Sequence, residues 1–193
     1  MECKMLNVLS KQTMCQESPA GISNYAVIIP TENIAEMSLI DGHARYQITG
    51  SGTGGELKGY YVDFKSQTGQ VTSTSNGMGK GFTATGTGRV ELNEDGFSYL
   101  ARLLNNFDYY IVLFATGNTD DNGNPEFYVV GNENGEVTFS NESDTGQERS
   151  GDHGHTFTVT CPYQKYPLMK WSGAIADADE NDNYQPYDGD SSN

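Results

Sequence analysis

The histidines and cysteines are the residues whose chemistry could support catalysis or metal binding. His153 and His155 flank a glycine and follow Asp152, and Cys161 lies further along the same segment. Two histidines at a loop–strand junction supply only part of a zinc site, and no Cys-x-x-Cys pair accompanies them. We interpret them as solvated loop histidines and predict no metal site.

Two acidic stretches have carboxylates or amides at alternate positions, as calcium loops do. They are residues 120–124 and 177–181. Both depart from the calcium-loop pattern, which needs a glycine at its sixth position and a following helix. We therefore predict solvated acidic turns at both places.

Enzyme signatures are also lacking. The glycine-rich stretches 50–55 and 77–81 have neither a phosphate-loop ending nor an attached helix. No Gly-x-Ser-x-Gly elbow occurs, and no base–nucleophile pair stands out. The sequence predicts no catalytic residue, no cofactor and no enzymatic activity.

The charge composition argues against nucleic acid and anionic membranes as binding partners. The chain has 193 residues and a formal net charge of −15. Duplex nucleic acid and anionic membranes are both bound through basic residues, which this chain largely lacks. Three widely spaced cysteines give no disulfide framework, and the first residues lack the apolar run of a signal peptide. We expect a protein made in a cytoplasm, with no membrane contact.

A helical period occurs in one place. The apolar stripe consists of Phe97, Leu100, Leu104 and Phe107. This spacing predicts a helix over about 94–107, which Asn93 can cap.

Most of the remaining chain is predicted to form short strands. They are 25–29, 43–49, 57–65, 81–92, 108–115, 127–130, 136–140 and 155–160, with an edge segment at 163–171. Residues 108–115 are apolar throughout after the first, so we expect a strand buried on both faces. In 57–65 we expect Leu57, Tyr61 and Phe64 to point inward. Residues 33–40 fit either an extended stretch or a helical turn.

These elements predict a mainly β protein, a β-sandwich or small barrel flanked by one α-helix, with long loops and extended termini. We expect residues 1–20 to form an N-terminal arm and residues 21–172 a single β-rich domain. A long hairpin loop lies at about 65–80, a polar loop at 141–154, and an acidic, flexible tail at 173–193.

Part of the chain resembles bacteriophage tail tube proteins. Strand 81–92, the helix and strand 108–115 precede YVVGNENGEVTF at 128–139 and SDTGQERSGDHGHTFTVT at 143–160. The resemblance covers roughly residues 80–172. It implies a β body flanked by one helix, in subunits that form hexameric rings stacked into a tube with an electronegative channel for DNA passage.

On this interpretation the protein is a virion structural protein whose partners are further copies of itself and other phage tail or neck proteins. DNA is its passing cargo. The contacts between copies are expected on the polar loops, at Thr68, Gln70, Thr72, Met78, Asp144, Thr145 and Arg149.

Two alternatives remain. One is a neck or connector ring protein of the same virion. The other is a carbohydrate-binding or adhesion β-sandwich that uses exposed aromatic side chains. The candidates for that role are Tyr60, Tyr109, Tyr163, Tyr166 and Trp171.

Overall fold

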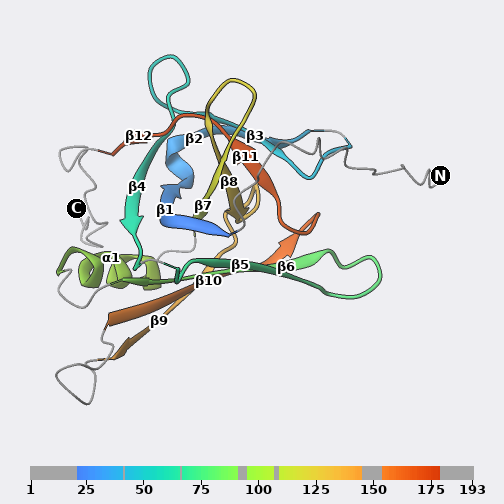
Figure 1. The fold of residues 1–193 in the computed structure, drawn as a ribbon. Helices are drawn as coiled ribbons and strands as arrows, with labels where there is room; N and C mark the ends of the chain where they lie inside the picture. Colours follow the sequence, from blue (N-terminus) through green and yellow to red (C-terminus); the bar gives the residue numbers. More distant parts are fainter. Residues whose placement is uncertain are drawn as a thin grey trace, which may run out of the picture.

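A computed structural model describes residues 21–40, 42–65, 67–90, 95–106, 109–144 and 154–178. In these ranges the chain forms three β-sheets and one α-helix (Figure 1). The predicted mainly β, sandwich-like architecture with one helix is confirmed. The small-barrel alternative is wrong, because the sheets do not close on themselves.

The largest sheet has six strands in the order β11-β8-β7-β1-β4-β12. Their bounds are β1 Ile22–Pro30, β4 Lys58–Asp63, β7 Tyr110–Thr119, β8 Pro125–Val130, β11 Lys170–Ser172 and β12 Ala176–Asp177. Neighbouring strands are antiparallel except for β12, which pairs with β4 in parallel. The segments 108–115 and 127–130, both predicted as strands, pair with each other as β7 and β8.

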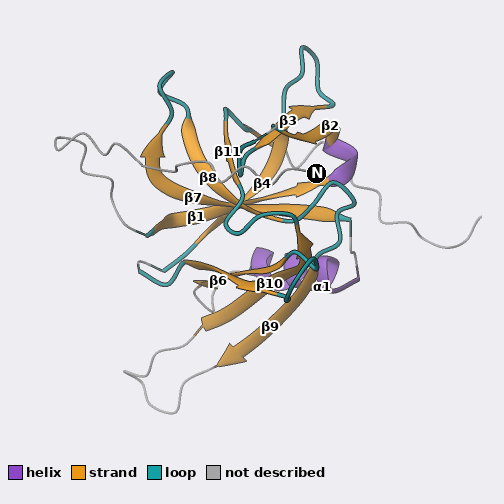
Figure 2. Ribbon diagram, turned by 90° about the vertical axis from the view of Figure 1, so that its right-hand side faces the viewer, coloured by secondary structure: helices purple, strands orange, loops and turns teal. Residues whose placement is uncertain are grey.

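A second sheet has four strands in the order β5-β6-β10-β9. Their bounds are β5 Gln70–Ser75, β6 Phe82–Val90, β9 Thr138–Asp144 and β10 Gly154–Gln164. The third sheet pairs β2 (Ile34–Leu39) with β3 (Tyr46–Gly50), after a short 3-10 turn at Thr31–Asn33. The ambiguous stretch 33–40 is therefore extended over most of its length. Figure 2 shows the four-stranded sheet packed below the larger one.

Strand β7 lies at the centre of the molecule and is buried on both faces, as predicted. Every residue from Tyr110 to Ala115 is at most 2% exposed. Val112 and Phe114 belong to the core shared with the four-stranded sheet, whereas Ile111 and Leu113 belong to a second core shared with β3 and β11. Alternate residues of one strand thus hold two separate apolar layers together.

Helix α1 (Asp95–Asn106) matches the predicted helix at 94–107. Ala101 and Leu104 are buried in the first core, and Leu100 packs against it. These residues carry the predicted apolar stripe into the sandwich beside β9. Asn93, Phe107 and the side chain of Phe97 lie outside the described part.

Two glycines of β6 make room for the aromatic centre of the first core. Phe64, Phe114 and Phe157 pack with ring centroids 5.3 to 6.3 Å apart. A Cβ at Gly86 would lie 2.2 Å from Cε2 of Phe114, and one at Gly88 would lie 2.8 Å from Cε1 of Phe64. The sheet can therefore approach these rings only where β6 has no side chain.

Three expected features differ from the structure. Tyr61 is 43% exposed, whereas Leu57 is buried in the second core and Phe64 in the first, as expected. The expected hairpin loop at 65–80 contains β5, so a hairpin is present but its loop is confined to residues 76–81. The expected loop at 141–154 is wrong at both ends, since β9 continues to Asp144 and β10 begins at Gly154, and residues 145–153 lie outside the described ranges.

The expected tail boundary at 173 is also wrong. Ala176 and Asp177 pair with Lys58 and Gly59, and Ala178 is buried. The β body therefore extends at least to residue 178. Residues 179–193, like the expected arm at 1–20, lie outside the described ranges.

We predict that Gly86→Ala lowers the free energy of unfolding by about 1–3 kcal/mol, because the added methyl group overpacks the core against Phe114. Urea denaturation measures the change. The control is Thr87→Ser, which lies on the opposite face of β6 and should change stability by no more than about 0.5 kcal/mol. Equal stability of Gly86→Ala and wild type would contradict the packing described.

Candidate assembly surface

The outer face of the four-stranded sheet is an array of hydroxyl side chains. Along β6 and β10 the hydroxyl residues alternate with residues that point into the core. Ala84, Phe157 and Val159 are buried there. The outward positions are occupied by Gln70, Thr72, Thr74, Thr83, Thr85, Thr87, Arg89, Thr138, Ser140, Glu142, Asp144, Thr156, Thr158 and Thr160. Threonine suits such a strand, because its branched side chain packs on a pleated surface.

The strand register aligns these hydroxyl groups in rows across the sheet. One row runs through Thr72, Thr85, Thr160 and Thr138, and the next through Gln70, Thr87, Thr158 and Ser140. Neighbouring side chains in a row are about 4.8 Å apart, and successive rows about 6.8 Å. The charged residues Arg89, Glu142 and Asp144 lie toward one end, so most of the face is polar and uncharged.

Both outer strands of this sheet are open edges within the described part of the chain. Each of β5 and β9 pairs with a single neighbour, β6 and β10 respectively. Both strands are mostly exposed and contain no proline, and β5 contains no charged residue. By contrast, the edges of the six-stranded sheet, β11 and β12, span three and two residues. A long polar edge is a template for pairing with another strand.

The expected contact residues on the β5–β6 hairpin have different environments. Gln70 and Thr72 are exposed on β5, and Met78 is fully exposed in the turn. Thr68 is half-buried: its hydroxyl donates to the Lys65 carbonyl oxygen at 2.6 Å and accepts from the Arg89 N–H at 3.2 Å. Thr68 therefore fixes the start of the hairpin, while the other three side chains remain accessible.

The remaining expected contacts are not close to these. Asp144 is exposed at the end of β9, on the opposite edge of the same sheet. Thr145 and Arg149 lie outside the described ranges. The structure thus divides the described candidates between the two edges of one sheet instead of gathering them into one patch.

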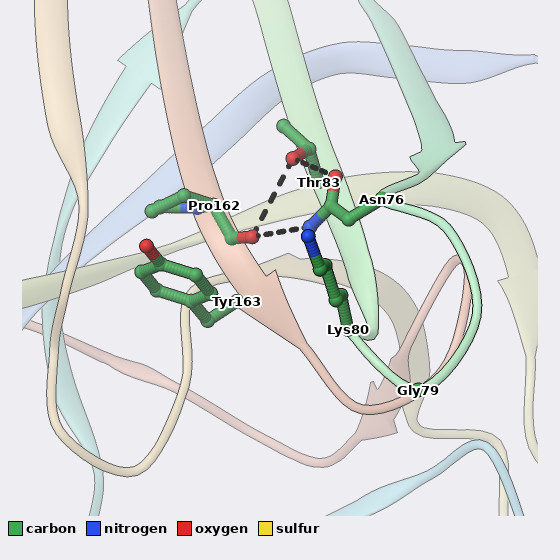
Figure 3. Close-up of a pocket in the computed structure, with 6 residues that line it drawn as sticks. All are labelled: Asn76, Gly79, Lys80, Thr83, Pro162 and Tyr163. Carbon is green, nitrogen blue, oxygen red and sulfur yellow. Dashed lines mark hydrogen bonds between the residues drawn. The ribbon is translucent and has the colours of Figure 1, made fainter.

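A cleft of about 520 Å³ lies where the β5–β6 turn meets β10. Figure 3 shows the residues that line it, which are Asn76, Gly79, Lys80, Thr83, Pro162 and Tyr163. The Asn76 side chain donates to the Pro162 carbonyl oxygen at 2.8 Å and accepts from the Thr83 hydroxyl at 2.7 Å. These bonds fix the wall of the cleft, and Lys80 and Tyr163 provide its accessible groups.

The histidine and cysteine candidates are used structurally. His155 is buried, and its Nδ1 lies 2.8 Å from the Ser143 hydroxyl across the β9–β10 pair. Cys161 is a free, buried thiol whose pKa is raised by burial, which makes it a poor nucleophile at neutral pH. His153 lies outside the described residues. Within those residues, no three His, Cys, Asp or Glu side chains are arranged to hold a metal ion.

The acidic turn at 120–124 is closed by its own first carboxylate. Asp120 Oδ1 accepts the N–H groups of Asn122 and Asn124, both at 2.9 Å, and Oδ2 accepts the Asn124 side-chain amide at 3.2 Å. These hydrogen bonds lower the pKa of Asp120, and the backbone and side-chain bonds from Asn124 have the largest effect. The carboxylate thus shapes a turn between β7 and β8. Residues 179–181 of the other acidic stretch lie outside the described part.

The aromatic residues considered for sugar binding do not form a platform. Trp171 is buried and packs on Phe127 with ring centroids 5.7 Å apart. Tyr166 packs against the second core, and Tyr60 is half-buried. Tyr109 and Tyr163 are about two-thirds exposed. Tyr109 forms an isolated β-bridge with Glu136, and Tyr163 lies near the end of β10. The adhesion alternative receives no support from this arrangement.

A buried carboxylate engages two of the basic residues. Glu126 accepts from Arg45 Nη2 at 2.6 Å and from Lys170 Nζ at 2.8 Å, and Arg45 Nη1 donates to the Ser172 hydroxyl. The Lys170 ammonium also lies 5.3 Å from the centre of the Tyr128 ring. This network joins the segment before β3 to β8 and β11, so Arg45 and Lys170 serve the fold.

No protein-family model matches this chain, and no curated protein matches its sequence. The resemblance to tail tube proteins therefore remains a hypothesis drawn from the sequence pattern. No helix in the described part of the chain has the length and apolar character needed to cross a bilayer.

The open edge on β5 and the array of threonines were not predicted from the sequence. Gln70 to Ser75 has Val71 as its single aliphatic residue, so its pairing with β6 had no apolar signal. The Thr-x-Thr-x-Thr patterns at 83–87 and 156–160 were available, and their alternation with Ala84, Gly86, Phe157 and Val159 marks a uniform outer face.

We predict that the Asp120 carboxyl titrates below its ordinary pKa of 3.8, because the turn amides donate to its charged form. Carbon-detected NMR as a function of pH measures this value. Because the Asp120 pKa is lower in the folded state, its ionised form stabilises the fold at pH values above the pKa of the unfolded chain. This contribution is lost as the pH falls through the pKa of the folded state. Asn124→Gly should move the pKa back toward 3.8. An unshifted wild-type value would contradict the turn geometry.

Proposed function

We propose that this protein is a virion structural subunit, of the phage tail tube type, that assembles with copies of itself through the two open edges of its four-stranded sheet. The observation that carries the proposal is that β5 and β9 are exposed edges of one sheet. The sequence resemblance supports the same conclusion independently, since tail tube subunits form rings.

The strand directions favour pairing between β9 of one copy and β5 of the next. All neighbours in the sheet are antiparallel, so β5 and β9 run in opposite directions. Placing a second copy beside the first therefore brings β5 antiparallel to β9, and the sheet continues across the contact. Such a contact joins two different surfaces, and repeating it gives a closed ring or a helix.

A ring of this kind determines which face points inward. The six-stranded sheet and α1 cover one face of the four-stranded sheet and are too bulky for the interior of a closed ring. The hydroxyl face would then line a channel. Its wall would carry one arginine, Arg89, against Glu142 and Asp144 in each copy. DNA could pass along it without the phosphate neutralisation that binding requires.

This wall differs from the electronegative channel that the resemblance implies. The threonine rows are uncharged, and most acidic residues of the described part lie elsewhere. Hydroxyl groups bind water at least as readily as phosphate, so low adhesion would come mainly from the scarcity of cations. The acidic surface of the body would contribute long-range repulsion.

Negative-stain electron microscopy of the purified full-length protein at high concentration tests the proposal. We expect rings or tubes. The variant Gln70→Lys/Thr72→Lys places two charges on the β5 edge and should abolish them while leaving the fold intact, because lysine on an edge opposes strand pairing.

The matched control is Thr53→Lys/Glu56→Gln, which makes the same change of two charges in the exposed turn between β3 and β4. This control should assemble as the wild type does. Monodisperse monomers of the wild type at every salt concentration, or normal assembly of the β5 variant, would reject edge pairing.

A further inference from the structure

A basic and aromatic corner forms where the β5–β6 turn meets the end of β10. A Cβ at Gly81 would lie 2.6 Å from the Gln164 carbonyl oxygen, so these two backbones are in direct contact. Lys80 precedes Gly81 and Lys165 follows Gln164, and both lysines are exposed. Tyr163 is 65% exposed and lines the cleft beside Lys80 (Figure 3). Met78, fully exposed, lies in the same turn.

The two lysines have no carboxylate partner among the described residues. This sets them apart from Arg45 and Lys170, which are held by Glu126. The whole chain has 11 basic residues against 26 acidic ones. An accessible pair of lysines beside exposed apolar side chains is therefore a local exception on an acidic protein, and it favours an acidic ligand with aromatic character.

The chain contains a segment with that chemistry. No lysine or arginine follows Lys170, and the last residues combine acids with Tyr184, Pro186 and Tyr187. The acids after β12 are Asp179, Glu180, Asp182, Asp188 and Asp190. Carboxylates can pair with the two lysines, while the tyrosines can pack on Tyr163 and Met78.

The position of β12 indicates which copy supplies the segment. Figure 1 shows β12 and the β5–β6 turn on opposite sides of the body. The 15 residues after Ala178 span at most about 50 Å when fully extended. A domain of this size is about 40 Å across, and the route around its surface is longer. A copy reaching its own corner would need nearly the full length, whereas a neighbouring copy can present its corner directly.

We propose that the basic corner formed by Lys80, Lys165, Tyr163 and Met78 binds the acidic C-terminal segment, residues 179–193, of a neighbouring copy. Donor and acceptor lie on opposite sides of one molecule, so the contact repeats head to tail. It deepens the proposed function, on which it rests, by adding a second contact between copies that is separate from the sheet edges.

Zero-length carbodiimide cross-linking of the full-length protein tests this. Unlabelled and ¹⁵N-labelled chains are mixed, allowed to assemble, cross-linked and analysed by mass spectrometry. We expect peptides that join Lys80 or Lys165 to acids between 179 and 190, with light and heavy partners combined in the statistical proportion. Raising the salt to about 1 M shortens the Debye length to about 3 Å and should reduce their yield at least about fivefold.

Lys65 is the internal control, since it is exposed at the other end of the β5–β6 hairpin and should not join the C-terminal segment. Three outcomes would overturn the inference: no such cross-links, cross-links of a single isotope only, or equal yields at Lys65. If rings form through the sheet edges in the same sample, these outcomes reject the corner contact alone. If the sample also forms no rings or tubes, both the corner contact and the proposed function are rejected.

Discussion

The burial of β7 on both faces is the constraint on which the rest of the structure depends. A strand with no exposed side chain from Tyr110 to Ala115 must be covered by a layer on each side. The four-stranded sheet and α1 supply one layer, and β3 with β11 contributes to the other. The glycines at 86 and 88 permit the first layer to come close enough to contact Phe114 and Phe64.

This arrangement leaves the four-stranded sheet with one buried face and one face that no other described residues cover. The buried face takes its apolar residues from alternate positions of β6 and β10, and the intervening threonines point away from the core. The apolar residues of the first core are already buried without a further strand beside β5 or β9. The open edges therefore follow from the way that β7 is covered, and they are the surfaces where additional backbone pairing can occur without changing the fold.

The elements with a strong apolar pattern were predictable from the sequence. The stripe containing Leu100 and Leu104 located α1, and the continuous apolar run after Asp108 located β7. Strand β5 was not predictable, because its pairing depends on the backbone of β6 and on little apolar burial. The same is true of β12, where Ala176 and Asp177 pair with β4 after an acidic sequence had suggested a mobile tail.

The expected contact residues illustrate the same limit. Gln70, Thr72 and Met78 were placed on an exposed hairpin, as the sequence of polar residues suggested, but the bonds that engage Thr68 depend on Lys65 and Arg89, which are brought together only by the fold. The basic corner likewise depends on the approach of Gly81 to Gln164, the neighbours of Lys80 and Lys165, which are far apart in the chain. Contacts between distant polar segments have no periodic signal, whereas buried apolar faces do.

Hydrogen exchange of the assembled and the monomeric protein tests the central claim most directly. Backbone amides at the open edges of β5 and β9 exchange with solvent in the monomer, and pairing between copies would protect them. The account predicts new protection in both strands on assembly, with little change in β7, which is already buried. Protection confined to other surfaces, with β5 and β9 unchanged in the assembled protein, would contradict it.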